Sequence, residues 1–261
     1  MTVDNAKMGM DNSLSGLPGA HVVRPTAEEA AGALAELLVE HLQTRLAAAE
    51  PLHLALSGGS SAKLLGPALK ANDRLSKEEW SRVHLWMVDE RCVPDDDPQL
   101  NFPLIRDGVA APLSIPTANL HAMPVLRKNG DQEYEHAIRL ALSVRPPADR
   151  RLDAVVLGMG PDGHTASLFP QSPALDETER LVVFNDGERV VPPRPRMTFT
   201  YPALSSAHLI FLLVTGAGKR DALAKTAART SNFHDWPVAG LSPSSDDRLL
   251  WFLDRDALPA P

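Results

Sequence analysis

The sequence predicts an α/β protein with a Rossmann-like fold, in which a mainly parallel, doubly wound sheet carries helices on both faces. Short apolar segments alternate along the chain with longer segments whose apolar residues recur at helical spacing. Several of the short segments are apolar at every position, which is typical of strands covered on both faces. Hydrophobic residues make up 44% of the chain but aromatic residues only 5%, so aliphatic side chains must build most of the core.

Composition narrows the functional class before any motif is considered. The chain has 261 residues and a formal net charge of −7, with no basic block that would attract nucleic acid or an anionic membrane. The longest uninterrupted apolar run, 209–214, is far shorter than the about 20 residues of a membrane-spanning helix. The single cysteine, Cys92, excludes an internal disulfide and a cysteine-based metal cage. We expect a soluble, cytoplasmic protein without nucleic-acid or membrane partners.

The chain divides into a tail and one domain. Residues 1–20 are polar, lack periodicity and lack the apolar core of a secretory signal, so we expect a loose, disordered tail. No repeat, low-complexity block or linker interrupts 21–261, which we expect to form a single α/β domain. The stretch 94–124 is rich in Pro, Asp and Asn and predicts irregular loops with a short helix at most.

The expected strands are short apolar segments that end in glycine or charged residues. Segment 53–56 runs into a glycine turn, 83–88 runs into three charged residues, and 154–157 stops at Gly158. The complete set of expected strands is 53–56, 83–88, 154–157, 181–184, 197–200, 209–214 and 249–253.

The expected helices carry their own start signals and periodicity. Thr26 and Glu29 have the spacing of a capping box at the start of an Ala- and Leu-rich run. A helix is also expected after the glycine turn that follows 53–56, but Gly66 and Pro67 predict that it is short or kinked. The Ala- and Leu-rich helix is expected at 26–49, and two further helices are expected at 131–144 and 218–229.

Ligands of parallel α/β sheets bind beyond the carboxyl ends of the strands, so the residues after each strand are the candidate site. Ser57, Gly58, Gly59 and Ser60 form such a turn, and free N–H groups at a following helix start attract phosphate. The alternative is an ordinary tight turn with a helix cap. Neither the dinucleotide-binding fingerprint nor the Walker pattern is present, so nucleotide binding is not supported.

The segment GMGPDGHTAS at 158–167 offers a second candidate. A histidine with a carboxylate partner, here His164 with Asp162, builds a general base near neutral pH. If His164 begins a helix, the positive end of that helix keeps the ring neutral. The alternative is an aspartate that caps the helix and a histidine that points to water.

Charged residues follow two further strands. Asp89 and Arg91 stand in the triplet Asp-Glu-Arg after 83–88, and the alternative for them is a solvated strand end. Arg196 precedes 197–200 and Lys219 follows 209–214. Both side chains suit a phosphate, and the alternative for each is a surface charge.

Together these segments resemble the glucosamine-6-phosphate isomerase and 6-phosphogluconolactonase superfamily, and within it the 6-phosphogluconolactonases. The resemblance runs from about residue 21 to the last expected strand. Its most specific piece is LGMGPDGHTASLFP at 157–170. Supporting pieces are LSGGSS at 56–61, VDER at 88–91, RMTFT at 196–200 and GAGK at 216–219. The resemblance implies a Rossmann-like fold and hydrolysis of 6-phospho-D-glucono-1,5-lactone in the oxidative pentose phosphate pathway.

The resemblance also implies roles for the candidate residues. His164 matches the catalytic histidine, Asp162 its aspartate, and Arg91 an arginine proposed to act near the reacting centre. Asp89 matches an acidic residue that the deaminases use at the sugar. The positions that surround the phosphosugar are Ser57, Gly58, Gly59, Ser60, Arg196 and Lys219, of which Arg196 and Lys219 are the expected phosphate ligands. The reaction so implied needs no metal and no cofactor, and its partner is a small phosphosugar lactone.

Alternatives remain at this point. The family's frequent Ser-Asn-Tyr/Phe triplet is replaced by Leu100-Asn101-Phe102, so a serine hydroxyl is missing. Deaminases carry a glutamate where this chain has Phe169, and a phenyl ring cannot shuttle protons, which argues against deamination. A sugar-phosphate sensor without catalysis and a lactonase for unphosphorylated lactones are the other candidates. We expect a monomer by default, with a homodimer as the alternative.

Overall fold

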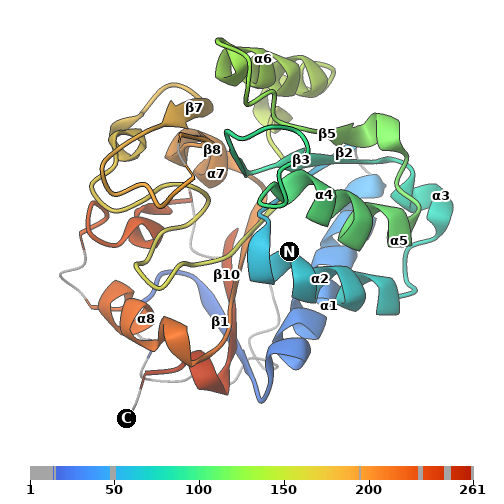
Figure 1. The fold of residues 1–261 in the computed structure, drawn as a ribbon. Helices are drawn as coiled ribbons and strands as arrows, with labels where there is room; N and C mark the ends of the chain where they lie inside the picture. Colours follow the sequence, from blue (N-terminus) through green and yellow to red (C-terminus); the bar gives the residue numbers. More distant parts are fainter. Residues whose placement is uncertain are drawn as a thin grey trace.

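A parallel sheet forms the centre of the protein (Figure 1). The computed structural model describes residues 14, 16–47, 51–193, 195–228, 232–243 and 248–259. Within these residues the sheet has seven strands in the order β1-β10-β9-β6-β2-β3-β5, and every neighbouring pair is parallel. The strands are β1 (Ala20–Arg24), β2 (Leu52–Leu56), β3 (Val83–Met87), β5 (Leu120–His121), β6 (Ala154–Leu157), β9 (Leu209–Val214) and β10 (Leu249–Asp254).

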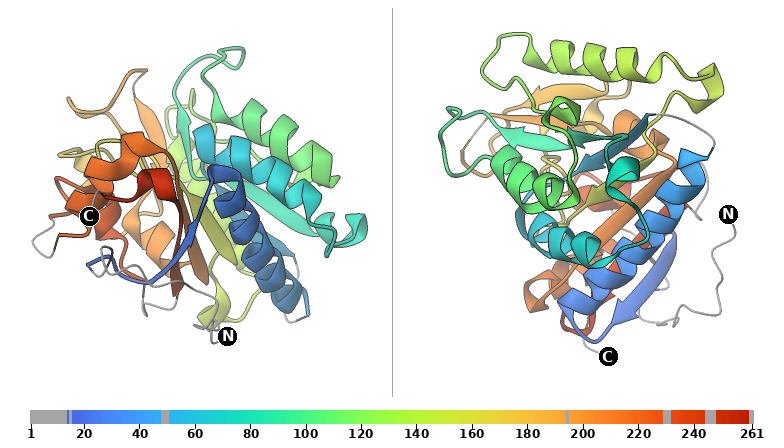
Figure 2. Two further views of the ribbon diagram at one scale, coloured as in Figure 1. Left: turned by 90° about the horizontal axis from the view of Figure 1, so that it is seen from below. Right: turned by 90° about the vertical axis from the view of Figure 1, so that its right-hand side faces the viewer.

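Helices lie on both sides of this sheet, so the predicted fold class is confirmed (Figure 2). The long helices α1 and α2 pack side by side on one face, and α4 and α5 extend that layer, while α7 and α8 lie on the other side. The helix α6 packs against β7 of a second, smaller sheet. The α-helices are α1 (Ala27–Leu46), α2 (Gly59–Ala71), α3 (Lys77–Trp80), α4 (Asn101–Ile105), α5 (Ala111–Leu113), α6 (Gly130–Leu142), α7 (Tyr201–Ser206) and α8 (Arg220–Thr226).

The strand order reverses between β2 and β6. From β2 the chain continues to β3 and β5 on one side, and from β6 it continues to β9 and β10 on the other. In doubly wound sheets such a reversal opens a crevice at the carboxyl ends of the two central strands. The turns that follow β2 and β6 therefore border this crevice.

Two expected strands do not join the central sheet. The segments predicted as 181–184 and 197–200 form β7 (Val182–Asn185) and β8 (Arg196–Phe199), which pair antiparallel with each other and with β4 (Asp89–Arg91). Val88 links the two sheets, because its N–H donates to the Leu56 carbonyl at 3.1 Å and its carbonyl accepts from the Phe199 N–H at 2.8 Å. The first strand of the small sheet, β4, therefore begins directly after the end of β3 and the linking residue Val88.

The predicted boundary of the tail at residue 20 is wrong. Leu14 and Leu17 are buried in the core, and the indole N–H of Trp251 donates to the Pro18 carbonyl at 2.8 Å. The strand β1 begins at Ala20 and pairs with β10 at the sheet edge. The prediction followed the polar composition of the segment and overlooked the two leucines that anchor it. Residues 1–13 lie outside the described part of the chain.

The helix after the glycine turn, which was predicted to be short or kinked, is not short. It runs without interruption from Gly59 to Ala71 with Pro67 inside it. Pro67 is exposed, so the missing backbone hydrogen bond lies on the side that faces water. Gly66 serves packing, because a β-carbon there would stand 2.1 Å from the carbonyl oxygen of Gly108. The stretch 94–124 is also more regular than predicted, since α4, a π-helical turn (Arg106–Ala110) and α5 follow one another in it.

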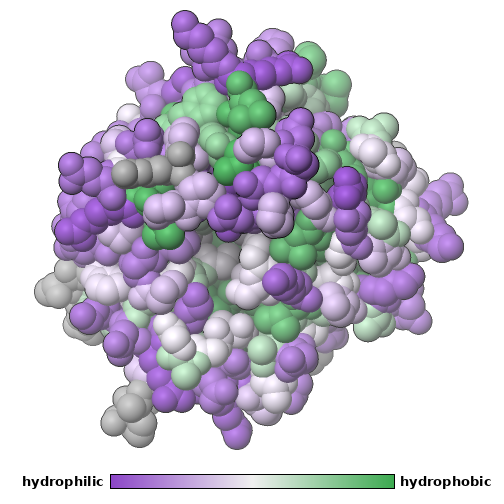
Figure 3. All heavy atoms as spheres, viewed as in Figure 1, coloured by the Kyte–Doolittle hydropathy of each residue, from purple (hydrophilic) through white to green (hydrophobic). Residues whose placement is uncertain are grey.

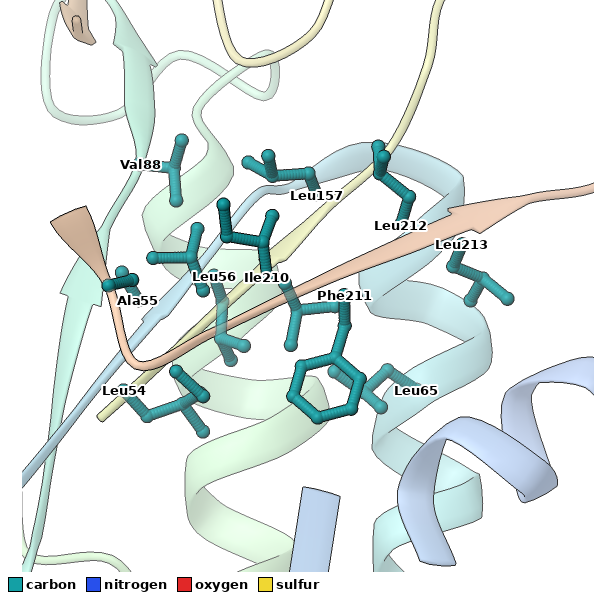
Figure 4. Close-up of a cluster of buried hydrophobic side chains, with 14 of the residues drawn as sticks. Leu54, Ala55, Leu56, Leu65, Val88, Leu157, Ile210, Phe211, Leu212 and Leu213 are labelled. Atoms are coloured by element: carbon teal, nitrogen blue, oxygen red, sulfur yellow. The ribbon is translucent and has the colours of Figure 1, made fainter. Parts of the chain in front are cut away.

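Aliphatic side chains fill the interior, as the composition predicts. Leu54 and Leu56 of β2, Leu157 of β6 and Ile210 of β9 lie together in the cluster of Figure 4, and each is 1% exposed or less. The outer surface differs: Figure 3 shows mostly hydrophilic residues on one face of the molecule, with hydrophobic ones in small separate groups. No helix in the described ranges is long and apolar enough to cross a membrane.

Three histidines gather at the β2–β3–β5 edge of the sheet. The indole of Trp86 stacks on His121 with ring centroids 3.7 Å apart and donates to Nδ1 of His53 at 3.1 Å. Nδ1 of His84 and Nε2 of His121 share a hydrogen bond of 2.9 Å, which requires the accepting nitrogen to be unprotonated and therefore at least that ring to be neutral. Burial lowers the pKa of His53 to about 3 and that of His121 to about 4, and it also lowers the pKa of His84.

The two glycines in the middle of the long helices predict opposite outcomes for the same substitution. Gly66→Ala forces a methyl group against the Gly108 carbonyl and should lower the free energy of unfolding by about 1–3 kcal/mol. Gly32→Ala meets nothing within 4 Å and should raise it by about 0.5–1 kcal/mol through helix propensity. Urea unfolding measures both; equal effects would contradict the close approach of α2 to the neighbouring helical segment.

The histidine cluster predicts that the free energy of unfolding already falls at pH values above those at which carboxylates become protonated. Below pH 6.5 the unfolded chain protonates these histidines while the folded protein does not, so the free energy of unfolding should fall from pH 6.5 to about 4. Urea unfolding at pH 7.5, 6 and 5 measures this. His121→Phe keeps the ring stacked on Trp86 but removes one titrating group, so its decline should be smaller. A stability that stays flat between pH 7.5 and 5 would refute the role of the cluster.

Candidate active site

A cleft of about 190 Å³ opens at the reversal point, beyond the carboxyl ends of β2, β6 and β9. Its size suits a small molecule, since each water molecule of the liquid takes about 30 Å³. Segments far apart in the sequence meet here. The predicted residues that line it are Ser57, Gly58, Gly59, Ser60, Asp89, Arg91, His164 and Lys219.

The turn after β2 forms one wall of the cleft and has the features of an anion site. Gly58 is the N-cap of the 13-residue helix α2, so the first N–H groups of that helix lack partners within it. Gly59 has a φ of +70°, which favours glycine. The buried Oγ of Ser57 has no hydrogen-bond partner among the described residues. A buried hydroxyl and a positive helix end at the same place favour a bound anion.

The opposite wall carries the histidine and the aspartate of the second motif. Nδ1 of His164 lies 2.5 Å from Oδ1 of Asp162. A carboxylate only accepts, so Nδ1 carries the proton, and in the neutral form of the ring Nε2 has the free lone pair. Burial raises the pKa of Asp162, but the hydrogen bond to His164 and the charge of that ring outweigh it, and the pKa lies below its usual range. The pair therefore has the geometry of an oriented base.

No helix begins at His164 in the described chain, so the condition under which a helix end would keep the ring neutral is not met. Residues 161–163 and 166–167 form turns instead, and Gly163 has a φ of +77°. The indole of Trp236 stands 2.7 Å from where a β-carbon of Gly163 would be, and the Gly163 carbonyl accepts from the Val238 N–H at 2.9 Å. The 232–243 segment thus supports the motif from behind.

The Asp-Glu-Arg triplet is a buried network and not a solvated strand end. Asp89 accepts a hydrogen bond of 2.6 Å from the hydroxyl of Ser167. Nη1 of Arg91 donates to Oδ1 of Asn101 at 2.8 Å and to the Gln99 carbonyl. Both Asn101 and Arg91 line the cleft, so this network holds a cation at its edge.

Glu90 supports the network and was not predicted as a site residue. Its carboxylate accepts the backbone N–H groups of Arg91, Asn101 and Phe102, each at 2.8 Å. Burial raises the pKa of Glu90 although these donors oppose the shift. Asn101 was also missed as a site residue. The sequence offered a signal for it, because it occupies the asparagine position of the Ser-Asn-Tyr/Phe triplet.

Of the two basic residues that were expected to bind the phosphate, Lys219 alone is among the residues that line the cleft. Lys219 lines the cleft, where burial lowers its pKa while the charge of Asp162 opposes that shift. Arg196 does not line the cleft. Its Nε donates to the Pro193 carbonyl at 2.6 Å and its Nη2 to the Val191 carbonyl at 2.8 Å. Burial, with help from the charge of Arg91, lowers the pKa of Arg196.

Two other features of the site bear on its chemistry. Burial raises the pKa of the Cys92 thiol to about 11, so its thiolate is scarce near neutral pH. Among the described residues, no group of three or more His, Cys, Asp or Glu is arranged to hold a metal ion. The polar groups that line the cleft include His164, which contacts Asp162, the helix end with Ser57, Asp89 and Arg91, and Lys219.

Comparison with known proteins identifies the family. The family model described as glucosamine-6-phosphate isomerases/6-phosphogluconolactonase matches residues 25–251. The chain belongs to this family. It is 35% identical over 225 residues to a 6-phosphogluconolactonase from a Nostoc species, and this match covers 85% of this chain and 90% of the Nostoc protein. It is also 35% identical over 207 residues to one from a Synechocystis species, with 78% and 82% covered.

Solved structures of the family share the fold. The 6-phosphogluconolactonase from Trypanosoma cruzi superimposes with a TM-score of 0.78 at 28% identity, over 93% of this chain and 96% of that one. The 6-phosphogluconolactonase from Thermotoga maritima gives 0.73 at 25% identity, over 90% and 99%. The family predicted from the motifs is confirmed.

The three donors on Glu90 make a testable prediction for the network. In Glu90→Gln the amide NH₂ replaces one acceptor oxygen and faces a buried N–H, so the free energy of unfolding should fall by about 1–3 kcal/mol. Glu133→Gln, at a side chain that is 47% exposed, is the control and should change it little. Urea unfolding of both variants decides, and equal stabilities would contradict the structural role of Glu90.

Proposed function

We propose that this protein is a 6-phosphogluconolactonase, which hydrolyses 6-phospho-D-glucono-1,5-lactone to 6-phospho-D-gluconate in the oxidative pentose phosphate pathway. The observation that carries the proposal is the pairing of an oriented base, His164 on Asp162, with an anion-binding helix start across one cleft. The relatives named above support the choice of substrate, since the Nostoc and Synechocystis proteins bear that name.

His164 acts as the general base. Its Nε2 takes a proton from a water molecule while that water attacks the C1 carbonyl of the lactone. Asp162 holds the proton on Nδ1 and stabilises the imidazolium that forms, because the carboxylate lies 2.5 Å away. The proton then returns from His164 to the ring oxygen as the C1–O bond breaks, which gives the open-chain carboxylic acid. This acid then loses a proton to water and becomes the carboxylate.

The negative charge that develops on the carbonyl oxygen needs donors. Arg91 lines the cleft and keeps its guanidinium in place through Asn101 and the Gln99 carbonyl. Preorganised donors of this kind stabilise an oxyanion more than water does, since they need no reorganisation. Backbone N–H groups of the glycine-rich turns are the alternative donors.

The phosphate binds at the start of α2 and on Lys219. The free N–H groups of the helix, the unpartnered Ser57 hydroxyl and the ammonium of Lys219 suit a dianion. Binding energy from the phosphate, remote from C1, orients a flexible sugar for reaction. Direct phosphate binding by Arg196 stays a prediction, because two of its nitrogens are held by backbone carbonyls outside the cleft.

Deamination of an amino-sugar phosphate is the rival reaction. Phe169 stands where the deaminases carry a glutamate, and its ring is only 2% exposed. Glucosamine 6-phosphate should therefore release no ammonia with this protein. We also retain the proposals of a cytoplasmic monomer that acts on a small phosphosugar without nucleic-acid or membrane partners.

Removal of the base tests the proposal directly. His164→Ala should lower kcat by about 10²–10⁴-fold, the usual contribution of a general base. The measurement is formation of 6-phosphogluconate from the freshly generated lactone, corrected for spontaneous hydrolysis. His234→Ala, a histidine paired with Asp176, is the control and should keep full activity. Hydrolysis by His164→Ala at the wild-type rate would refute the mechanism.

The phosphate site predicts a different kinetic signature. Lys219→Met removes a charged donor and should raise KM for the phosphorylated lactone by about 10- to 100-fold. With unphosphorylated gluconolactone the same variant should behave like wild type, whose activity on that substrate should be low. Lys70→Met, an exposed residue in the last turn of α2, serves as the control. If the wild-type protein prefers the unphosphorylated lactone, the result would favour the alternative function, a lactonase for unphosphorylated lactones.

A further inference from the structure

The side chain of Phe169 lies against the ring of His164 and has no part in the mechanism above. The two ring centroids are 4.5 Å apart and the planes are inclined by 36°. Phe169 is 2% exposed, whereas the His164 side chain is 28% exposed. Phe169 is not among the residues that line the cleft. Any effect of this ring on a bound substrate must therefore pass through the histidine.

A phenyl ring at this distance does more than fill space. Its π-face is electron-rich and attracts a cation whose centre lies within about 6 Å of the ring centroid. His164 becomes such a cation in the step in which it takes a proton from water. The same ring already attracts a second cation, since Cζ of Arg196 lies 5.7 Å from its centroid. Phe169 thus occupies a place where the charge of a neighbouring side chain matters.

We infer that Phe169 is a positioning residue for the proposed lactone hydrolysis: it holds the His164 ring at the cleft and stabilises the imidazolium formed during the reaction. The inference rests on the proposed function only in its kinetic part. The position is the one at which the deaminases carry a glutamate for proton transfer. In this chain an apolar ring takes the position and acts on the base without exchanging a proton.

Other charges also face His164 and set the background for this effect. Asp162 contacts its Nδ1, and Lys219, Asp89 and Arg91 line the same cleft. Arg196 lies beyond Phe169. A leucine in place of Phe169 removes none of these charged groups and keeps an apolar side chain. The comparison of phenylalanine with leucine therefore isolates the π-face.

The experiment follows the His164 ring itself. Nitrogen-15 spectra of the histidine side chains, recorded from pH 5 to 9, give the titration of His164, assigned by its absence in His164→Gln. In Phe169→Leu the ring should hold its proton about two- to fivefold less tightly. Phe169→Tyr retains a π-face and should titrate like wild type. Phe252→Leu, in β10 and stacked on Phe211, is the control for an equal loss of core volume.

Kinetics supply the second measurement. Phe169→Leu should lower kcat by a similar two- to fivefold and leave KM unchanged, and the acid limb of its pH–rate profile should move to lower pH. If Phe169→Leu does not fold, Phe169→Met replaces it as a second side chain without a ring. Wild-type titration and kcat in the folded variant would overturn the inference and leave the proposed function standing. If the wild-type protein does not hydrolyse the lactone, the proposed function fails, and the nitrogen-15 titration still decides whether the ring stabilises the imidazolium.

Discussion

The pairing of β2 with β6 is the constraint on which the site depends. These two strands lie at the point where the strand order reverses, so the turns that follow them have to share one crevice. The contact is close, because a β-carbon at Gly158 would stand 2.5 Å from the hydroxyl of Ser61. For this reason the start of α2 and His164, which lie about a hundred residues apart in the chain, border the same cleft.

Buried polar groups hold the walls of the crevice in place. Glu90 gathers three backbone N–H groups, Asn101 holds Arg91, and Ser167 ties the histidine loop to Asp89. A β-carbon at Gly58 would lie 2.1 Å from Oδ1 of Asn101, so the helix start and the arginine network also touch. Such a network fixes positions well because each missing partner would leave a buried group unpaired. The groups that we propose to be catalytic are held by the same network.

Much of this could be predicted from the sequence, and the exceptions have physical causes. Apolar strands such as 154–157 and 209–214 agree with the structure residue for residue, because a strand covered on both faces has to be apolar throughout. The strand β1 was missed since only Val22 of it is fully buried at the sheet edge. The start of the site motifs was also predictable, as each follows a strand that is easy to recognise. The hydrogen bonds of Arg196 to backbone carbonyls could not be predicted, because a strand position does not tell which side of a small second sheet a long side chain will take.

The surroundings of His164 illustrate the same limit. Local sequence indicated a histidine with an aspartate two residues before it, and the structure joins them at 2.5 Å. The local sequence did not reveal that turns follow His164 in place of a helix, nor that Phe169 lies against its ring. Both features depend on packing against 232–243 and the small sheet. Contacts between segments distant in the chain decide the surroundings of the His164 ring.

A crystal structure with 6-phosphogluconate bound is the most direct measurement of the relation between the two walls. The phosphate should lie at the start of α2 within hydrogen-bond distance of Lys219, and the C1 carboxylate should lie beside Nε2 of His164. A product bound with its phosphate elsewhere, or with C1 turned away from His164, would contradict the assignment of the two walls.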